Sequence, residues 1–442
     1  MHHDNGIWVG PEDLMRDEAF AQSSQREFSV ENIDQTDGNW QASRRDFLKL
    51  MGFSLGAATL AASCEIPVKK AIPYVTKPDE IVPGVANYFA TSFSNGGDYC
   101  AILVKTREGR PIKIEGNTLS SVTHGGTSAR AQASVLSLYD TRRIHHAGNV
   151  KDGKVEKVEW NVLDSEVKSK LTGNIRIISN TNISPSAGKA MAEFMTKYPS
   201  ATVVTYDAVS SAALLEANEK CFGVRAFPHY KFDEATVICS FGADFLGTWG
   251  NPIQHARDYA KGRKVAGKKM AKMSRHYQVE GYMSLTGSNA DSRIQIRPSE
   301  TGAAIAALYA ELSGNGGGPK LNDKAGAAIK KVAIELQAAR GKSIVVTASN
   351  NVAEQIIVNR INDILGNLNS TIDFNGAIFT RKGDERQMYN LIQEMNGGQV
   401  ATVIVWGANP AWELPNAAAF QEAFKKVGPR ISLNTNLDET TL

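Results

Sequence analysis

Cysteine is scarce in this sequence, with four among 442 residues, at positions 64, 100, 221 and 239. None of the four forms a C-x-x-C pair, so the simplest zinc and redox motifs are absent and a disulfide scaffold is excluded. Proline is also infrequent (15 residues), and the 38 glycines follow no G-X-Y period, which excludes collagen. Neither charge sign dominates, since 49 basic residues stand against 46 acidic ones. A net charge of +3 gives no indication of nucleic-acid binding.

The apolar run near the N-terminus is short. It covers residues 50–62, thirteen residues in all, whereas a membrane-spanning helix needs about 20. Arg44 and Arg45, followed by Phe47 and Leu48, precede it and closely resemble a twin-arginine export signal. The alternative is the basic start of an amphipathic helix, which the glycine and serine content weakens. We therefore predict a signal peptide over 41–63, exported by the twin-arginine pathway, behind a disordered acidic leader over 1–40.

Small residues stand directly before Cys64, as in the lipobox of bacterial lipoproteins, where the thiol receives diacylglycerol. The usual leucine lies one place too early, at Leu60, and Ala61 takes its position. A free buried cysteine is the other interpretation. Residues 64–84 hold four prolines, which suits an extended tether between an anchor and a globular body. The pattern predicts lipid attachment at Cys64.

Two different rhythms follow the tether. Residues 85–150 alternate in the manner of a small β-rich unit, and residues 151–442 alternate short β-branched runs with alanine-rich stretches. This second rhythm predicts parallel sheets with helices on both faces, a doubly wound Rossmann-like α/β region. The clearest expected strands are 175–178, 202–205, 236–239, 344–346 and 402–405, and the clearest helices are 186–197, 208–219, 301–313, 325–339, 352–365 and 416–426.

Small residues with asparagine or aspartate follow several of these strands, at Asn180, Asp244, Asn350 and Asn409. Ligands of open α/β sheets lie beyond the carboxyl ends of the strands, so these positions are candidate ligand contacts. The same residues also dominate ordinary turns, and that interpretation stays open. His145 and His146 are adjacent, and their side chains would diverge on any regular element, so the pair does not indicate a metal site. A basic run over 257–275 forms either a solvated face or a docking surface for an acidic partner.

Several segments resemble a known superfamily. Glu80–Val85, Val104–Asn117 and Gly125–Gln132 resemble the molybdopterin oxidoreductases. Ser240–Leu246, Met283–Asp291 and Trp406–Pro410 are more specifically similar to the molybdopterin-oxidoreductase-like half of the iron–sulfur subunit of bacterial alternative complex III. The resemblance implies a molybdopterin-oxidoreductase-like α/β fold, with the 85–150 unit as a degenerate iron–sulfur domain.

The resemblance also shows a departure. Active members carry a cluster site with the spacing C-x₂-C-x₃-C-x₂₆-C, whose four positions fall here on Phe93, Gly96, Cys100 and Thr127. A [4Fe–4S] cluster needs about four thiolates, and only Cys100 is a cysteine. Residues 298–302 also depart from the Pro-Gly-Thr-Asp pattern of the family's pterin contacts. We therefore expect no catalytic, cofactor-binding or metal-binding residue and no cofactor in this chain, whose chemistry was lost while its fold was kept.

The resemblance implies a role in a larger assembly. The expected function is that of a structural domain of a respiratory quinol:electron acceptor oxidoreductase on the periplasmic side of the bacterial inner membrane. Expected partners are integral-membrane quinol-binding subunits and multihaem cytochrome c subunits, without nucleic acid. The family's C-terminal half, with [4Fe–4S] and [3Fe–4S] clusters, has no match here, so we expect the α/β region to be truncated at its C-terminal end. Two alternatives remain: an active molybdenum-bis(pterin) reductase, and a stand-alone ligand-binding surface lipoprotein.

Overall fold

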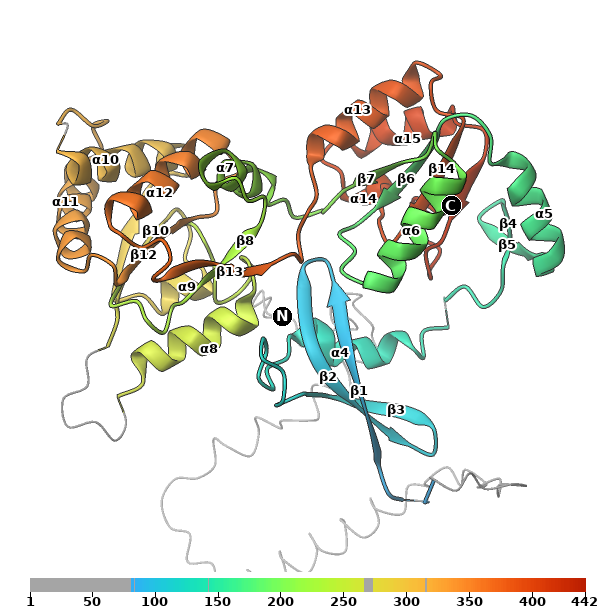
Figure 1. Cartoon of the computed structure of the whole chain (residues 1–442), viewed down its shortest axis with the longest axis horizontal. Helices are drawn as coiled ribbons and strands as arrows, with labels where there is room; N and C mark the ends of the chain where they lie inside the picture. Colours follow the sequence, from blue (N-terminus) through green and yellow to red (C-terminus); the bar gives the residue numbers. More distant parts are fainter. Residues whose placement is uncertain (1–80, 83, 142, 266–272, 315) are drawn as a thin grey trace, which may run out of the picture. The chain divides into compact units, whose positions relative to one another are not determined.

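The computed structural model describes residues 81–82, 84–141, 143–265, 273–314 and 316–442 (Figure 1). The predicted leader, signal peptide, Cys64 and nearly all of the tether lie outside the described residues. None of the described helices is long and apolar enough to cross a membrane.

The first structured part is an antiparallel sheet of three strands, in the order β1-β2-β3. Its strands are β1 (Asn87–Asn95), β2 (Asp98–Arg107) and β3 (Arg110–Gly116), followed by helix α4 (Ala129–Ser137). Gly96 and Gly97 join β1 to β2 with φ of 56° and 90°, and such positive angles at both turn residues favour glycine. Cys100 and Ile102 of β2, Ile114 of β3 and Ala131 of α4 form a small buried core.

A parallel sheet follows, in the order β11-β10-β9-β12. Its strands are β9 (Val237–Phe241), β10 (Arg275–Glu280), β11 (Ser292–Gln295) and β12 (Ser343–Thr347). One face packs on α10 (Thr301–Ser313), α11 (Asp323–Ala338) and α12 (Val352–Ile364) through a core that includes Cys239 and Val345. The other face packs Ile238 and Ile344 against α7 (Ala212–Phe222) and α8 (Pro252–Arg263). Both faces are therefore covered by helices, as a doubly wound sheet requires.

A second parallel sheet has the order β15-β14-β6-β7. Its strands are β6 (Ile175–Ser179), β7 (Thr202–Thr205), β14 (Thr402–Trp406) and β15 (Arg430–Ser432). One face packs on α13 (Glu385–Asn396) and α15 (Ala417–Lys425), and the other on α6 (Pro185–Lys197). Figure 1 shows α13 and α15 on the side of this sheet opposite α6. The parallel sheet of β9, β10, β11 and β12 is inserted in the sequence between β7 and β14. The sheet of β6, β7, β14 and β15 is therefore built from two distant segments.

Short elements complete the described chain. They are β4 (Gly148–Lys151), β5 (Lys154–Lys157), α5 (Trp160–Lys170), β8 (Phe227–Tyr230), α9 (Leu285–Ser288), a 3₁₀ turn (Pro298–Glu300), β13 (Ile372–Ile378) and α14 (Pro410–Glu413). β4 pairs with β5, and β8 pairs with β13, both antiparallel.

The sequence predicted the β-rich unit and the parallel α/β region correctly. The five expected strands are present at β6, β7, β9, β12 and β14, and the six expected helices at α6, α7, α10, α11, α12 and α15. The helix expected over 208–219 begins later, at Ala212, because Ser210 Oγ accepts a hydrogen bond from the Ala212 N–H and holds the preceding residues in a turn. Strand β10, whose residues alternate between polar and apolar, was not predicted.

Candidate functional site

The four positions matched to the cluster motif lie around the β1–β2 hairpin and the start of α4. Phe93 and Cys100 stand directly opposite each other across the hairpin, and Gly96 lies in its turn. Thr127 directly precedes Ser128, the N-cap residue of α4, which contacts Cys100. The spacing thus brings these positions to one end of the β unit, around one thiol.

The Cys100 thiol is fully buried and bonded within the chain. Its Sγ accepts a hydrogen bond from the Ser128 N–H at 3.4 Å and lies 3.9 Å from Ser128 Oγ. Phe93 packs against the same small core. Thr127 Oγ1 accepts a hydrogen bond from Gln132 Nε2 at 2.8 Å. One thiol, a phenyl ring, a glycine and a hydroxyl do not supply the donors that an iron–sulfur cube requires, so these residues do not fit the group.

The polar side chains beyond the strand ends form a second candidate site. Asp244 follows β9, and its Oδ1 accepts two hydrogen bonds from Thr286, from the N–H at 2.9 Å and from Oγ1 at 2.8 Å. Thr286 Oγ1 in turn accepts from the Leu246 N–H at 2.9 Å. The Thr286 side chain is fully buried. These bonds connect two segments that carry the family resemblance, 240–246 and 283–291.

The same arrangement recurs beyond two other strands. Asp207, past β7, accepts from the Thr181 N–H at 3.0 Å and from Thr181 Oγ1 at 2.7 Å. Its Oδ2 also accepts from the backbone N–H groups of Lys382 and Gly383, at 3.1 and 2.8 Å. Asn409, past β14, accepts from the Thr440 N–H at 3.1 Å and from Thr440 Oγ1 at 2.7 Å. Each of these oxygens is therefore engaged by the chain's own donors.

Of the remaining strand-end residues, Asn350 is bonded within the chain and Asn180 packs against a neighbouring loop. Asn350 Oδ1 accepts from the Ala213 N–H at 3.3 Å, and Asn350 Nδ2 donates to Glu385 Oε1 at 2.9 Å. The Asn180 amide lies so close to Gly407 that a Cβ there would meet Asn180 Oδ1 at 3.2 Å, and Gly407 has a φ of 65°. Side chains used in this way hold loops together, as in ordinary turn chemistry.

Strand β10 carries a row of buried polar side chains that the sequence did not reveal. His276, Gln278 and Glu280 are at most 4% exposed. His276 Nε2 lies 3.3 Å from Gln278 Oε1, and Gln278 Nε2 donates to Glu280 Oε2 at 3.1 Å. Arg293 Nε donates to Glu280 Oε1 at 2.8 Å. Burial lowers the pKa of His276 to about 4, so the imidazole is neutral near pH 7.

The described part of the basic run 257–275 pairs with carboxylates of the same chain. Arg263 donates from Nη1 and Nη2 to the two oxygens of Asp291, both at 2.9 Å. Lys261 lies 3.2 Å from Asp233. The charges of Arg263 and Lys261 are thus paired within the chain, so these two residues give no indication of an acidic partner.

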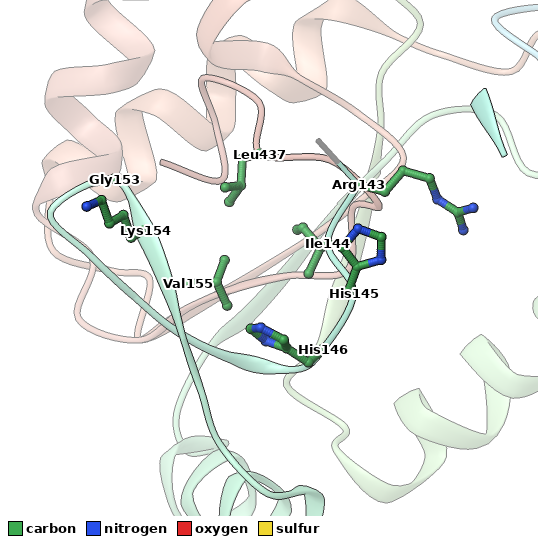
Figure 2. Close-up of a pocket in the computed structure, with 8 residues that line it drawn as sticks. All are labelled: Arg143, Ile144, His145, His146, Gly153, Lys154, Val155 and Leu437. Carbon is green, nitrogen blue, oxygen red and sulfur yellow. The ribbon is translucent and has the colours of Figure 1, made fainter. Parts of the chain in front are cut away.

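A pocket of about 220 Å³ lies where the chain leaves the β unit (Figure 2). It is lined by Arg143, Ile144, His145, His146, Gly153, Lys154, Val155 and Leu437. The Ile144 N–H donates to the Thr435 carbonyl at 2.8 Å, which joins this segment to the C-terminal one. Figure 2 shows the two imidazole rings leaving the chain in different directions. Across the described ranges, no group of three or more histidine, cysteine or acidic side chains is arranged to hold a metal ion.

Comparisons with known proteins match the fold alone. No protein family model matches the sequence, and no curated protein matches it either. Acetylene hydratase from Pelobacter acetylenicus, a molybdopterin enzyme, superposes with a TM-score of 0.55 at 11% identity, over 75% of this chain and 59% of its own. This chain thus spans less than two thirds of that protein. A chain of the formyltransferase/hydrolase complex from Methylorubrum extorquens matches with a TM-score of 0.44 at 14% identity, over 65% of this chain and 81% of its own. The superposition with acetylene hydratase shows that the fold is α/β and molybdopterin-oxidoreductase-like, as predicted.

Proposed function

We propose that this chain is a cofactor-free structural domain of a membrane-associated quinol:electron acceptor oxidoreductase of the alternative complex III type. In this role the α/β body holds its neighbours in place, and electrons travel through cofactors held elsewhere in the assembly. The proposed neighbours are quinol-binding integral-membrane subunits and multihaem cytochrome c subunits. The proposed location is the periplasmic face of the inner membrane.

The observation that carries the proposal is the state of the four cluster-motif positions. Cys100 is the one thiol among them, and it serves as a small buried apolar residue that accepts a hydrogen bond from Ser128. The engaged oxygens of Asp207, Asp244 and Asn409 support the same conclusion, because a ligand beyond the strand ends would have to displace bonds within the chain. Both features favour a scaffold over the alternative of an active molybdenum reductase.

Co-purification tests the role directly. An affinity-tagged chain is isolated from detergent-solubilised native membranes, and the eluate is assayed for covalently bound haem and for quinol oxidation. The proposal predicts that both co-elute with the tag. A chain that elutes alone, or with a quinol-independent reductase activity, would contradict it.

A substitution at Cys64 tests the proposed lipid anchor. Two or three acyl chains hold a protein stably on a membrane, whereas an unmodified thiol does not. Cys64→Ala should therefore move the chain to the soluble fraction when its partners are not expressed. Cys221→Ser is the matched control, since Cys221 is an exposed cysteine of the folded body. Intact-mass analysis that finds residue 64 unmodified would refute the anchor.

Arg44 and Arg45 test the export route. Replacing both by lysine keeps the charge but removes the paired guanidinium groups, whose geometry lysine does not reproduce. We expect the double variant to remain in the cytoplasm, as shown by protease protection in spheroplasts. Lys49→Arg serves as the control for a neighbouring charge. Normal export of the double variant would exclude this pathway.

A further inference from the structure

Within the described part of the chain, strand β1 is an edge strand without the features that usually protect an edge. It pairs with β2 on one side, and no described strand pairs with its other side. Its nine residues, Asn87–Asn95, include no charged residue and no proline, and the pairing with β2 runs without a bulge. Natural proteins protect exposed edges with charges, prolines, bulges or a covering element. An unprotected edge of this length is suited to pairing with another strand.

The hydrogen-bonding groups on this free edge can be assigned. Asn95 and Asp98 close a two-residue turn, so they form a hydrogen-bonded pair, and every second residue of β1 from Asn95 back to Asn87 bonds to β2. The backbone N–H and C=O groups of the intervening residues therefore point away from β2. These outward residues are Tyr88, Ala90, Ser92 and Ser94.

The sequence of β1 is nearly palindromic about Thr91. It reads Asn-Tyr-Phe-Ala-Thr-Ser-Phe-Ser-Asn, so Phe89 mirrors Phe93 and Asn87 mirrors Asn95. In an antiparallel pair of two β1 strands centred on Thr91, Tyr88 faces Ser94 and Ala90 faces Ser92 of the second copy. All of these are outward residues, so this register satisfies the hydrogen-bond pattern without adjustment.

The same register aligns favourable side chains. Thr91 faces Thr91, and Phe89 faces Phe93, in non-hydrogen-bonded pairs, where side chains approach most closely. Aromatic pairs and threonine pairs across strands both stabilise a sheet. The absence of charge on β1 leaves no repulsion across the two-fold axis. Thr91 itself is exposed, and Phe89 is 55% exposed although it shares a face with the half-buried Phe93.

From this juxtaposition we propose that β1 pairs antiparallel with β1 of a second copy of this chain, with the two-fold axis at Thr91. The two three-stranded sheets then join into one sheet of six strands. The partner is the same surface of the same protein, as two-fold symmetry requires. This inference does not rest on the proposed function.

Introducing a charge at Thr91, on the two-fold axis, tests the pairing. The purified full chain is examined by light scattering after size exclusion, with wild type expected to be dimeric. Thr91→Glu and Thr91→Lys each place like charges opposite one another and should be monomeric, with the dissociation constant raised roughly tenfold or more. An equimolar mixture of the two variants should recover a dimer, because opposite charges then meet. Unchanged circular dichroism confirms that each variant is folded.

A cysteine pair tests the register. In a Cys221→Ser background, Thr91→Cys should form an intermolecular disulfide, since Cα atoms of such a pair lie about 4.5 Å apart. Ser94→Cys is the matched control on the same edge, because six residues of offset separate its two copies by about 20 Å. A monomeric wild type overturns the proposal; β1 would then be available to pair with a strand of another protein. Equal crosslinking of both variants, or a mixture that stays monomeric, also overturns it.

Discussion

Three acidic or amide side chains beyond the strand ends share one bonding arrangement. Asp207, Asp244 and Asn409 each accept both the backbone N–H and the hydroxyl of one threonine. The sequence indicated two of these three residues as strand-end positions, but not their bonding partners. Asp244 and Asn409 were expected at strand ends, but their threonine partners are 42 and 31 residues away and no local pattern identifies them. Asp207 was not singled out because the large side chain of Tyr206, and not a small residue, stands between β7 and Asp207.

The bond between Thr286 and Asp244 gives a prediction at this scale. Thr286→Val removes a buried hydroxyl that donates to Asp244 and accepts from Leu246, so it should lower the free energy of unfolding by about 2 kcal/mol. Thr248→Val is the matched control, because Thr248 lies at 3.5 Å from the same carboxylate and is exposed, and should cost less than about 0.5 kcal/mol. Urea unfolding measures both. Equal effects would show that Thr286 has no special role.

Individual elements differ in how far their sequences determine them. β9 and β12 each contain a short run of β-branched residues (Val237–Ile238 and Ile344–Thr347) because both of their faces are buried, and such runs are recognisable. β10 is buried on both faces as well, yet every second residue is polar, which indicates a half-exposed strand. Its polar side chains satisfy one another and Arg293 instead of water. These hydrogen bonds depend on tertiary contacts, so the burial of β10 could not be predicted from the sequence.

The buried histidine of β10 predicts how stability depends on pH. Burial lowers the pKa of His276 from 6.5 to about 4, so the folded state favours the neutral ring. This contribution is fully present above pH 6.5 and is lost as the pH falls towards 4, because the unfolded chain takes up the proton first. The loss is on the order of 3 kcal/mol. Burial lowers the pKa of His255 further, to about 3, which adds to the slope in the same direction.

Urea unfolding at a series of pH values checks this dependence. His276→Gln should flatten the slope between pH 6.5 and 4, since an amide keeps hydrogen-bonding capacity but does not titrate. His145→Gln, the same substitution at an exposed position outside β10, is the control variant. Identical slopes in all three proteins would contradict the assignment to His276.

At the scale of the whole molecule, two parallel sheets and a small antiparallel unit keep a molybdopterin-oxidoreductase-like arrangement. The sequence predicted the strand–helix alternation, but not that β6 pairs with β14 more than 200 residues later. Strand partners in different segments follow from tertiary packing, which local patterns do not encode. The fold is stabilised by hydrophobic cores on both faces of each parallel sheet.

Metal analysis of the purified chain tests the central claim most directly. The account predicts neither iron nor molybdenum in stoichiometric amount, before or after incubation with iron and sulfide, and a colourless protein. Cys100→Ser should then change stability by no more than the replacement of a small buried group, about 1–2 kcal/mol, and should leave the absorption spectrum unchanged. A stoichiometric iron or molybdenum signal that disappears in Cys100→Ser would contradict the account.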